Sequence, residues 1–179
     1  ILEMARFKET GSARALIVTG CLAQRYQKEI LEEIPEVDAV LGTTSWEEIV
    51  PVVKELLEEK KETHVTCFHS LDELSGTGKP RILTTGGHYA YLKIAEGCDK
   101  RCTYCIIPYL RGPYRSVPME DLVREAEELA RQGVKELILV AQETTLYGVD
   151  LYGKKSLPQL LERLAQIPGI YWIRIQYCY

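Results

Sequence analysis

Three closely spaced cysteines are the most chemically informative feature of this 179-residue sequence. Cys98, Cys102 and Cys105 form the pattern C-x3-C-x2-C directly after a strand-like run at residues 89–95. Thiolates bind iron strongly, and a short loop is able to wrap three of them around one corner of a cubane cluster. Three protein ligands leave one of the four irons without a side chain, and an open position of this kind is where a substrate or cofactor binds. The motif therefore predicts a catalytic 4Fe-4S centre.

Other uses of these cysteines fit the sequence less well. A structural zinc site normally takes four ligands in two spaced pairs, and Cys67 and His69 would have to be recruited from a distance. Those two residues and His64 lie on or beside an expected short edge strand near residues 64–68, where we expect them to have no role. A disulfide framework suits small chains with little core. Iron–sulfur chemistry is the favoured interpretation, with zinc as the alternative.

The composition restricts the class of protein. The length suggests one large domain or two small ones, and 46% hydrophobic residues are enough for a true core. A net charge of −4 is the opposite of what a phosphate-binding surface needs, so nucleic acid is not expected as a partner of this segment. The sequence contains no run of 18 or more apolar residues, so it does not predict a membrane-spanning helix. Six cysteines with metal-type spacing and no secretory signal indicate a reducing cytoplasm. The chain has no initial methionine and stops within a strand-like pattern at Tyr179, so we expect a fragment of a longer protein.

Residues 1–60 predict a small α/β domain. Continuous apolar runs of strand length suit buried parallel strands, and they alternate with segments of helical spacing. Ser45 and Glu48 have the spacing of a capping box that starts a helix running towards Lys60. Strand and helix in alternation pack as a parallel sheet with helices on its faces. The expected strands are residues 13–19 and 37–41, and the expected helices are residues 1–8, 22–34 and 45–60.

Cys21 follows the first of these strands, at the edge where open α/β sheets bind their ligands. A single cysteine after an apolar strand is more often a small buried hydrophobic residue. Its position alone leaves both interpretations open.

Residues 61–88 have the charged and Gly/Ser/Pro-rich composition of a linker. From residue 89 onwards the order of expected elements is strand, helix, strand, helix, strand, which implies right-handed parallel crossovers. A complete (β/α)8 barrel needs about 250 residues, so residues 89–179 predict the first part of such a barrel. The expected strands are residues 89–95, 136–141 and 170–177, and the expected helices are residues 118–132 and 156–164, with Ser156 as the cap of the second.

The cysteine loop and a second polar loop are expected on the same rim of this barrel. The cysteines follow the first strand, and Gln142 and Glu143 follow the second. Barrels of this type carry their chemistry on the rim formed by the carboxyl ends of the strands. We therefore expect Gln142 or Glu143 to face a small molecule, with ordinary loop capping as the alternative.

The sequence resembles the methylthiotransferases, a branch of the radical S-adenosylmethionine (SAM) enzymes. The resemblance lies in Y-A-Y-L-K-I-A-E-G-C at residues 89–98, the C-x3-C-x2-C motif, Ile-Pro at residues 107–108 and Arg-Gly at residues 111–112. In addition, T-G-C-L-A-Q-R-Y at residues 19–26 is similar to the last cysteine motif of that family's N-terminal domain. The resemblance extends over essentially the whole chain, but over only the middle of the expected enzyme.

The resemblance implies two clusters. Cys98, Cys102 and Cys105 would hold a 4Fe-4S cluster whose free iron chelates SAM. Cys21 would be one of three ligands of a second 4Fe-4S cluster, and the other two would precede Ile1. A small C-terminal β-barrel of the family is also expected to be missing, so the fragment alone is expected to be inactive.

The resemblance also implies a mechanism. One-electron reduction, from a donor such as flavodoxin or ferredoxin, cleaves SAM to a 5′-deoxyadenosyl radical that removes hydrogen from a substrate carbon. The second cluster would supply the sulfur, and a second SAM the methyl group. Tyr104 would contact the adenine of SAM, and Gln142 or Glu143 its methionine or ribose end.

One loop indicates the substrate. Residues 142–150 read Q-E-T-T-L-Y-G-V-D, similar to the branch that modifies the β-carbon of an aspartate in a small-subunit ribosomal protein (protein twelve). The branch that modifies isopentenyladenosine in tRNA typically has G-Q-N-V there, and it remains the nearer alternative. A non-catalytic iron–sulfur or zinc-binding scaffold is the farther one. Val117 departs from the family, where relatives commonly have arginine, and this change would remove a basic contact.

Overall fold

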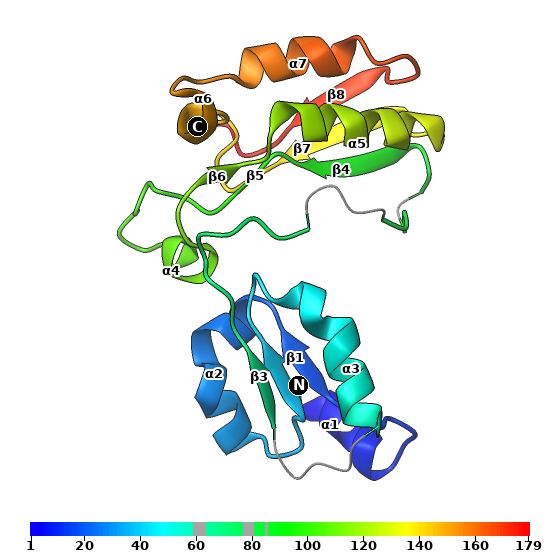
Figure 1. Ribbon diagram of the computed structural model, residues 1–179, viewed down its shortest axis with the longest axis vertical. Coiled ribbons are helices and arrows are strands. Elements are labelled where there is room, and N and C mark those ends of the chain that lie inside the picture. The colour runs from blue at the N-terminus through cyan, green and yellow to red at the C-terminus, as the bar shows by residue number, and fades with distance from the viewer. Residues whose placement is uncertain (59–63, 77–80, 85) are drawn as a thin grey trace. The chain divides into compact units, whose positions relative to one another are not determined.

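The computed structural model describes residues 1–58, 64–76, 81–84 and 86–179. The chain divides into two compact units, Ile1–Ser75 and Gly76–Tyr179, each built on a parallel sheet (Figure 1). The predicted α/β class is confirmed. The end of the predicted helix near Lys60 and parts of the predicted linker lie outside the described residues.

The first unit contains a three-stranded parallel sheet in the order β1-β2-β3. Its strands are β1 (Ile17–Thr19), β2 (Ala39–Leu41) and β3 (Val65–Cys67). The central strand β2 is fully buried, as expected for a parallel strand covered on both faces. Only the last three residues of the apolar run predicted at residues 13–19 form a strand, since these are the ones that pair with β2.

Helices cover both faces of this sheet (Figure 1). The helical elements are α1 (Leu2–Glu9), α2 (Cys21–Glu33), the 3-10 turn η1 (Trp46–Glu48) and α3 (Ile49–Glu58). Because successive strand residues point to opposite faces, Val40 packs in one apolar cluster with α2. Its neighbours Ala39 and Leu41 pack in the other cluster, with Val52 of α3. The short strands thus support two cores.

The predicted capping box at Ser45 and Glu48 is wrong. Ser45 precedes η1 without a side-chain capping bond, and its Oγ accepts a hydrogen bond from the backbone N–H of His69 at 2.8 Å. The α-helix begins only at Ile49, which places Pro51 in its first turn, where proline is tolerated. The hydroxyl therefore holds the segment that follows β3 instead of starting a helix.

The strand β3 comes from the predicted linker at residues 61–88. It pairs in parallel with β2, with Thr66 opposite Val40, and forms an edge of the sheet. This pairing extends the first compact unit to Ser75.

The second unit contains a parallel sheet in the order β4-β7-β8. Its strands are β4 (Tyr89–Lys93), β7 (Glu136–Val140) and β8 (Trp172–Ile175), and they alternate with the helices α5 (Met119–Arg131) and α7 (Leu157–Ala165). This is the predicted strand–helix order. Both helices lie on one side of the sheet (Figure 1), and their buried residues share one apolar cluster with β4 and β7.

The range predicted for α5, residues 118–132, is close to the observed one, whereas Ser156 does not cap α7. Pro118 precedes α5, and Gly133, with φ of +99°, follows its end. Ser156 does precede α7, but its side chain makes no capping bond and donates to the carbonyl oxygen of Lys154 at 3.0 Å.

Smaller elements close the loops of the second unit. They are β5 (Ala95–Glu96), α4 (Ile107–Arg111), β6 (Arg115–Ser116) and α6 (Val149–Tyr152). The strand predicted at residues 89–95 is divided, because β5 leaves the parallel sheet and pairs in antiparallel fashion with β6. No helix in the described part of the chain is long and apolar enough to span a bilayer.

The buried core of the second unit leads to a stability prediction. Leu139 of β7 is fully buried, so Leu139→Ala should lower the free energy of unfolding by about 2–5 kcal/mol. The matched control is Leu151→Ala, at a side chain that is 46% exposed, where about 0.5 kcal/mol or less is expected. Urea unfolding followed by circular dichroism measures both, and equal losses would contradict the assigned core.

Candidate metal centre

The cysteine motif lies in a loop whose two ends are joined by β5 and β6. Just inside this closure, the backbone N–H of Cys98 donates to the carbonyl oxygen of Gly112 at 3.2 Å. Gly97 has φ of +79°, and a Cβ added there would lie 2.0 Å from the carbonyl oxygen of Pro113. The two chain segments approach so closely that only glycine fits at this position.

All three cysteines of the motif are free, with Cys98 and Cys105 half-buried and Cys102 exposed. They lie outside helices and strands, and a backbone hydrogen bond of 2.9 Å from Cys105 N–H to the carbonyl oxygen of Cys102 forms a turn. Among the described residues, no three Cys, His, Asp or Glu side chains converge into a metal-binding geometry. The donor chemistry of three free thiols on one loop fits an iron–sulfur cluster, and the loop must draw the sulfur atoms together to bind it.

Cys21 lies in the first unit, at the start of α2 and directly after the Gly20 turn that ends β1. It is free and half-buried. This is the carboxyl edge of the sheet, where the sequence placed it. Its role as a cluster ligand stays a prediction.

The residues considered for zinc also lie in the first unit. Cys67 Sγ is 3.5 Å from His69 Nε2, and the same nitrogen is 4.0 Å from a carboxylate oxygen of Glu48. His64 instead contacts the carbonyl oxygen of Val37 through Nδ1, at 2.7 Å. In the part of the chain that the structure describes, these groups do not form a three-ligand site.

The predicted SAM-contacting residues have very different surroundings. Tyr104, on the cysteine loop, is 92% exposed, whereas Glu143 is fully buried. One carboxylate oxygen of Glu143 accepts hydrogen bonds from the backbone N–H and the hydroxyl of Thr145, at 2.9 and 2.5 Å. The other oxygen forms an ion pair with Lys100, which lies between the first two cysteines of the motif.

These contacts decide the charge state of Glu143. Burial raises the pKa of its carboxyl, but the hydrogen bonds from Lys100 and Thr145 outweigh burial and hold that pKa below its ordinary value. The hydrogen bond to Glu143 likewise raises the pKa of Lys100. Both groups are therefore charged at neutral pH, and the buried carboxylate is compensated.

Gln142 differs from its neighbour in lacking a charged partner: Glu143 Oε2, the other buried oxygen outside regular hydrogen-bond geometry, is engaged by the Lys100 ion pair. The Oε1 of Gln142 is buried and accepts no hydrogen bond from any described residue. A buried acceptor without a partner is unusual, and a donor group on a bound ligand would satisfy it. The two residues that the sequence could not separate are thus distinguished by their contacts.

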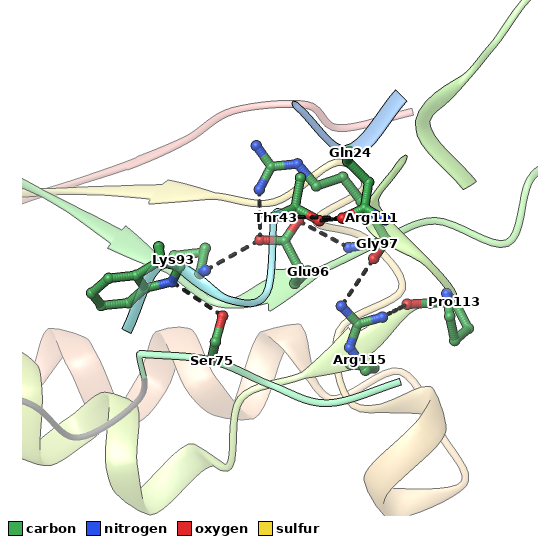
Figure 2. A network of polar contacts seen from close by, with 10 residues as sticks. Gln24, Thr43, Ser75, Lys93, Glu96, Gly97, Arg111, Pro113 and Arg115 are labelled. Carbon is green, nitrogen blue, oxygen red and sulfur yellow. Dashed lines mark hydrogen bonds and ion pairs between the residues drawn. The ribbon is translucent and has the colours of Figure 1, made fainter. Parts of the chain in front are cut away.

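A charged cluster that the sequence analysis missed supports the base of the cysteine loop (Figure 2). The carboxylate of Glu96, which is 7% exposed, binds the Lys93 ammonium at 3.2 Å and the Arg111 guanidinium at 3.3 Å. Arg115 donates to the carbonyl oxygens of Pro113 at 2.6 Å and Arg111 at 2.9 Å (Figure 2). Glu96 and Arg111 both lie in the sequence runs that carry the family resemblance. Their charge and their position beside the cysteine motif were the signal from which the sequence could have predicted this cluster.

The loop at residues 142–150 is bound to the segment that follows the cysteines. The Asp150 carboxylate accepts from the N–H and the hydroxyl of Ser116 at 2.7 and 2.6 Å, and the Tyr147 hydroxyl donates to the carbonyl oxygen of Val117 at 2.8 Å. The Tyr114 hydroxyl donates to the carbonyl oxygen of Glu143, also at 2.8 Å. Several residues of the Q-E-T-T-L-Y-G-V-D motif thus hold two loops together.

Comparison with known proteins identifies the second unit. Residues 92–178 match the family model of the radical SAM superfamily. The second unit contains a radical SAM domain. Over its whole length the chain is 64% identical to the ribosomal protein uS12 methylthiotransferase RimO of Lachnoclostridium phytofermentans. It is 54% and 50% identical to the proteins of the same name from Desulforamulus reducens and Clostridioides difficile.

These matches confirm the resemblance to methylthiotransferases that the motifs predicted. The chain spans about 40% of the length of each of these relatives. The radical SAM match begins within β4 and ends beyond β8, so it includes the cysteine loop and the loop at residues 142–150.

The close approach at Gly97 leads to a prediction. Gly97→Ala should destabilise the protein more than Gly133→Ala, although both glycines have positive φ. A Cβ at Gly133 meets no atom within 4 Å, so this control should cost only the conformational penalty of about 1–2 kcal/mol. At Gly97 the collision with Pro113 adds to that penalty. Thermal unfolding of both variants measures the difference, and equal destabilisation would show that the two segments are not in contact there.

The lowered pKa of Glu143 leads to a second prediction. At pH values above the ordinary pKa that this carboxyl has in the unfolded chain, the ionised carboxylate stabilises the fold. This stabilisation is lost as pH falls through the lower pKa that the carboxyl has in the folded state. Wild type and Glu143→Gln should therefore differ most in stability at neutral pH and converge in acid. Urea unfolding between neutral pH and about pH 3 tests this, and a difference that does not change with pH would contradict it.

Proposed function

We propose that the protein to which this chain belongs is a radical SAM methylthiotransferase that acts on the β-carbon of an aspartate in small-subunit ribosomal protein uS12. The observation that carries the proposal is the 64% identity, over the whole chain, to a uS12 methylthiotransferase. The Q-E-T-T-L-Y-G-V-D loop supports the same substrate, and in the fold it joins the cysteine loop through Glu143 and Lys100.

The residues of the second unit take the following parts in this proposal. Cys98, Cys102 and Cys105 hold a 4Fe-4S cluster. When bound, this group and SAM supply the one-electron reductive cleavage that generates a hydrogen-abstracting carbon radical. The chain itself fixes the loop: Gly97 admits the close approach of the backbone at residues 112–113, and the ion pairs of Glu96 hold the loop's base.

Two side chains are available for SAM. The buried Oε1 of Gln142 accepts a hydrogen bond from the amino group or a ribose hydroxyl, which would end its unpartnered state. The exposed ring of Tyr104 offers a flat apolar face for stacking against adenine. Glu143 is already engaged by Lys100 and Thr145, so Gln142 is the better candidate of the adjacent pair.

The first unit contributes to sulfur transfer in this proposal. Cys21 would be one ligand of a second 4Fe-4S cluster, which would supply the sulfur, and the other two ligands would come from outside residues 1–179. A second SAM donates the methyl group. The electron comes from a small donor such as flavodoxin or ferredoxin, and the protein works in the reducing cytoplasm, where its thiols stay reduced.

Deleting the gene in its host tests the substrate directly. Mass spectrometry of ribosomal proteins and of tRNA nucleosides should show loss of the methylthio mass from uS12, with tRNA unchanged. Loss of methylthioadenosine instead would transfer the protein to the tRNA-modifying branch. Unchanged methylthio groups in both pools would overturn the proposal.

A cysteine variant tests the metal assignment. Cys102→Ala should lower the iron bound after anaerobic reconstitution of the complete protein and abolish SAM cleavage, because one of three ligands is lost. Cys67→Ala is the matched control, a free cysteine outside the motif, and it should retain iron and SAM cleavage. Zinc in the wild type that is lost on Cys67→Ala would instead support the zinc alternative.

A further inference from the structure

We propose that Glu143 is a positioning residue, which fixes the cysteine loop to the end of β7 through Lys100 before any cluster is bound. This inference rests on the proposed function in one respect, that the cysteines of this loop are the cluster ligands. It assigns Glu143 a role within the protein and leaves contact with SAM to other side chains.

The Glu143 carboxylate is held in one orientation. One oxygen is held by both the N–H and the hydroxyl of Thr145, two residues further along the chain. These two bonds fix the side chain in one orientation, so the second oxygen is presented to Lys100. Both bonds are local, because Glu143 and Thr145 belong to the same short loop.

The two partners of this ion pair differ in burial. The Glu143 side chain is fully buried, while that of Lys100 is 39% exposed. A buried carboxylate without a cation is strongly unfavourable, whereas an exposed lysine without a partner costs almost nothing. The buried carboxylate therefore holds the lysine in place, and with it the middle of the cysteine loop.

Glu143 is contacted from both sides of the cysteine motif. Lys100 lies between Cys98 and Cys102 and binds the carboxylate. Tyr114, beyond the last cysteine, donates its hydroxyl to the carbonyl oxygen of Glu143 at 2.8 Å. The backbone N–H of Tyr114 also donates to the Asp99 carboxylate at 3.2 Å. Both arms of the loop are thus fastened to one residue at the end of a strand.

This arrangement has a consequence for cluster binding. Ordering a loop that has no helix or strand around its cysteines costs conformational entropy. If Lys100 is already fixed in the iron-free protein, part of that entropy cost is removed from cluster binding. Supporting contacts of this type hold a binding group within reach of its productive geometry. Loss of the contact should therefore loosen the loop in the iron-free protein and speed the loss of iron from the loaded protein.

Hydrogen exchange followed by mass spectrometry on the complete protein, stripped of iron, tests the proposal without relying on activity. Glu143→Gln keeps an oxygen for Thr145 and removes the charge that holds Lys100. Lys100→Met removes the ammonium. In both variants we expect the amides of residues 98–106 to exchange faster, on the order of tenfold. Exchange in β4, β7 and α5 should accelerate less than in the loop, and by no more than the loss of global stability that urea unfolding gives for the same variant.

Two further variants separate positioning from general stability. Lys100→Arg keeps the cation and should restore slow exchange in the loop. Glu136→Gln is the matched control, because it breaks an ion pair of 2.7 Å between β7 and Arg174 of β8 that does not involve the loop, and it should leave loop exchange unchanged. Lys100→Met also removes the contact of the ammonium with the Tyr179 ring, whose centroid is 4.7 Å away. The double variant Glu143→Gln/Lys100→Met should therefore exchange no faster than Lys100→Met alone, in which the ion pair is already lost.

Two outcomes would overturn the proposal. One is unchanged exchange at residues 98–106 in both single variants, and the other is acceleration spread equally over the whole second unit. The proposed function is tested separately, by iron binding to the wild type after reconstitution. A wild type that binds no iron would defeat the metal assignment, and the exchange of the iron-free loop would still decide whether Glu143 positions it.

Discussion

The parallel pairing of β4 with β7 determines where the candidate site residues of the second unit lie. Lys93 pairs with Val140 at the end of both strands, so the chain leaves the sheet twice at the same edge. The cysteine loop follows one exit, and the loop at residues 142–150 follows the other. The pairing depends on the apolar cluster beneath it, in which α5 and α7 cover β4 and β7. Packing in the core thus brings together two loops that are distant in sequence.

Charged groups then fix the two loops at this edge. Glu96 and Glu143 are both largely excluded from water, and each binds cations from another part of the chain. Buried ion pairs contribute little net stability compared with apolar packing, but breaking one partner is costly. Such pairs therefore specify one arrangement of the loops more than they stabilise the fold. This suits a site that has to hold its ligands in one geometry.

The motif at residues 142–150, from which the substrate was predicted, also makes structural contacts between loops. It resembles the ribosomal-protein branch of the methylthiotransferases, and the relatives that match the whole chain have that name. In the fold, Asp150 binds Ser116 and Tyr147 binds Val117. These contacts use a carboxylate and a phenol to join loops. The buried oxygen of Gln142 has no hydrogen-bond partner among the described residues, whereas that of Glu143 has the Lys100 ion pair. A residue pattern that distinguishes two branches therefore need not consist of residues that touch the substrate.

The sequence by itself determined the cysteine motif, the order of strands and helices, and the parallel character of both sheets. These features follow from local spacing and from apolar runs, which are visible along the chain. Only the tertiary structure decided the partners of polar side chains. Ser45 and Ser156 precede helical elements as predicted, but their hydroxyls bind His69 and Lys154. Likewise, the strand β3 became part of the first sheet through pairing with β2, and Glu143 was separated from Gln142 by its contact with Lys100. A polar side chain forms its hydrogen bond or ion pair with a group that the folded chain places next to it. For residues distant in sequence, this spatial proximity is set by packing of the core, so local sequence patterns do not predict it.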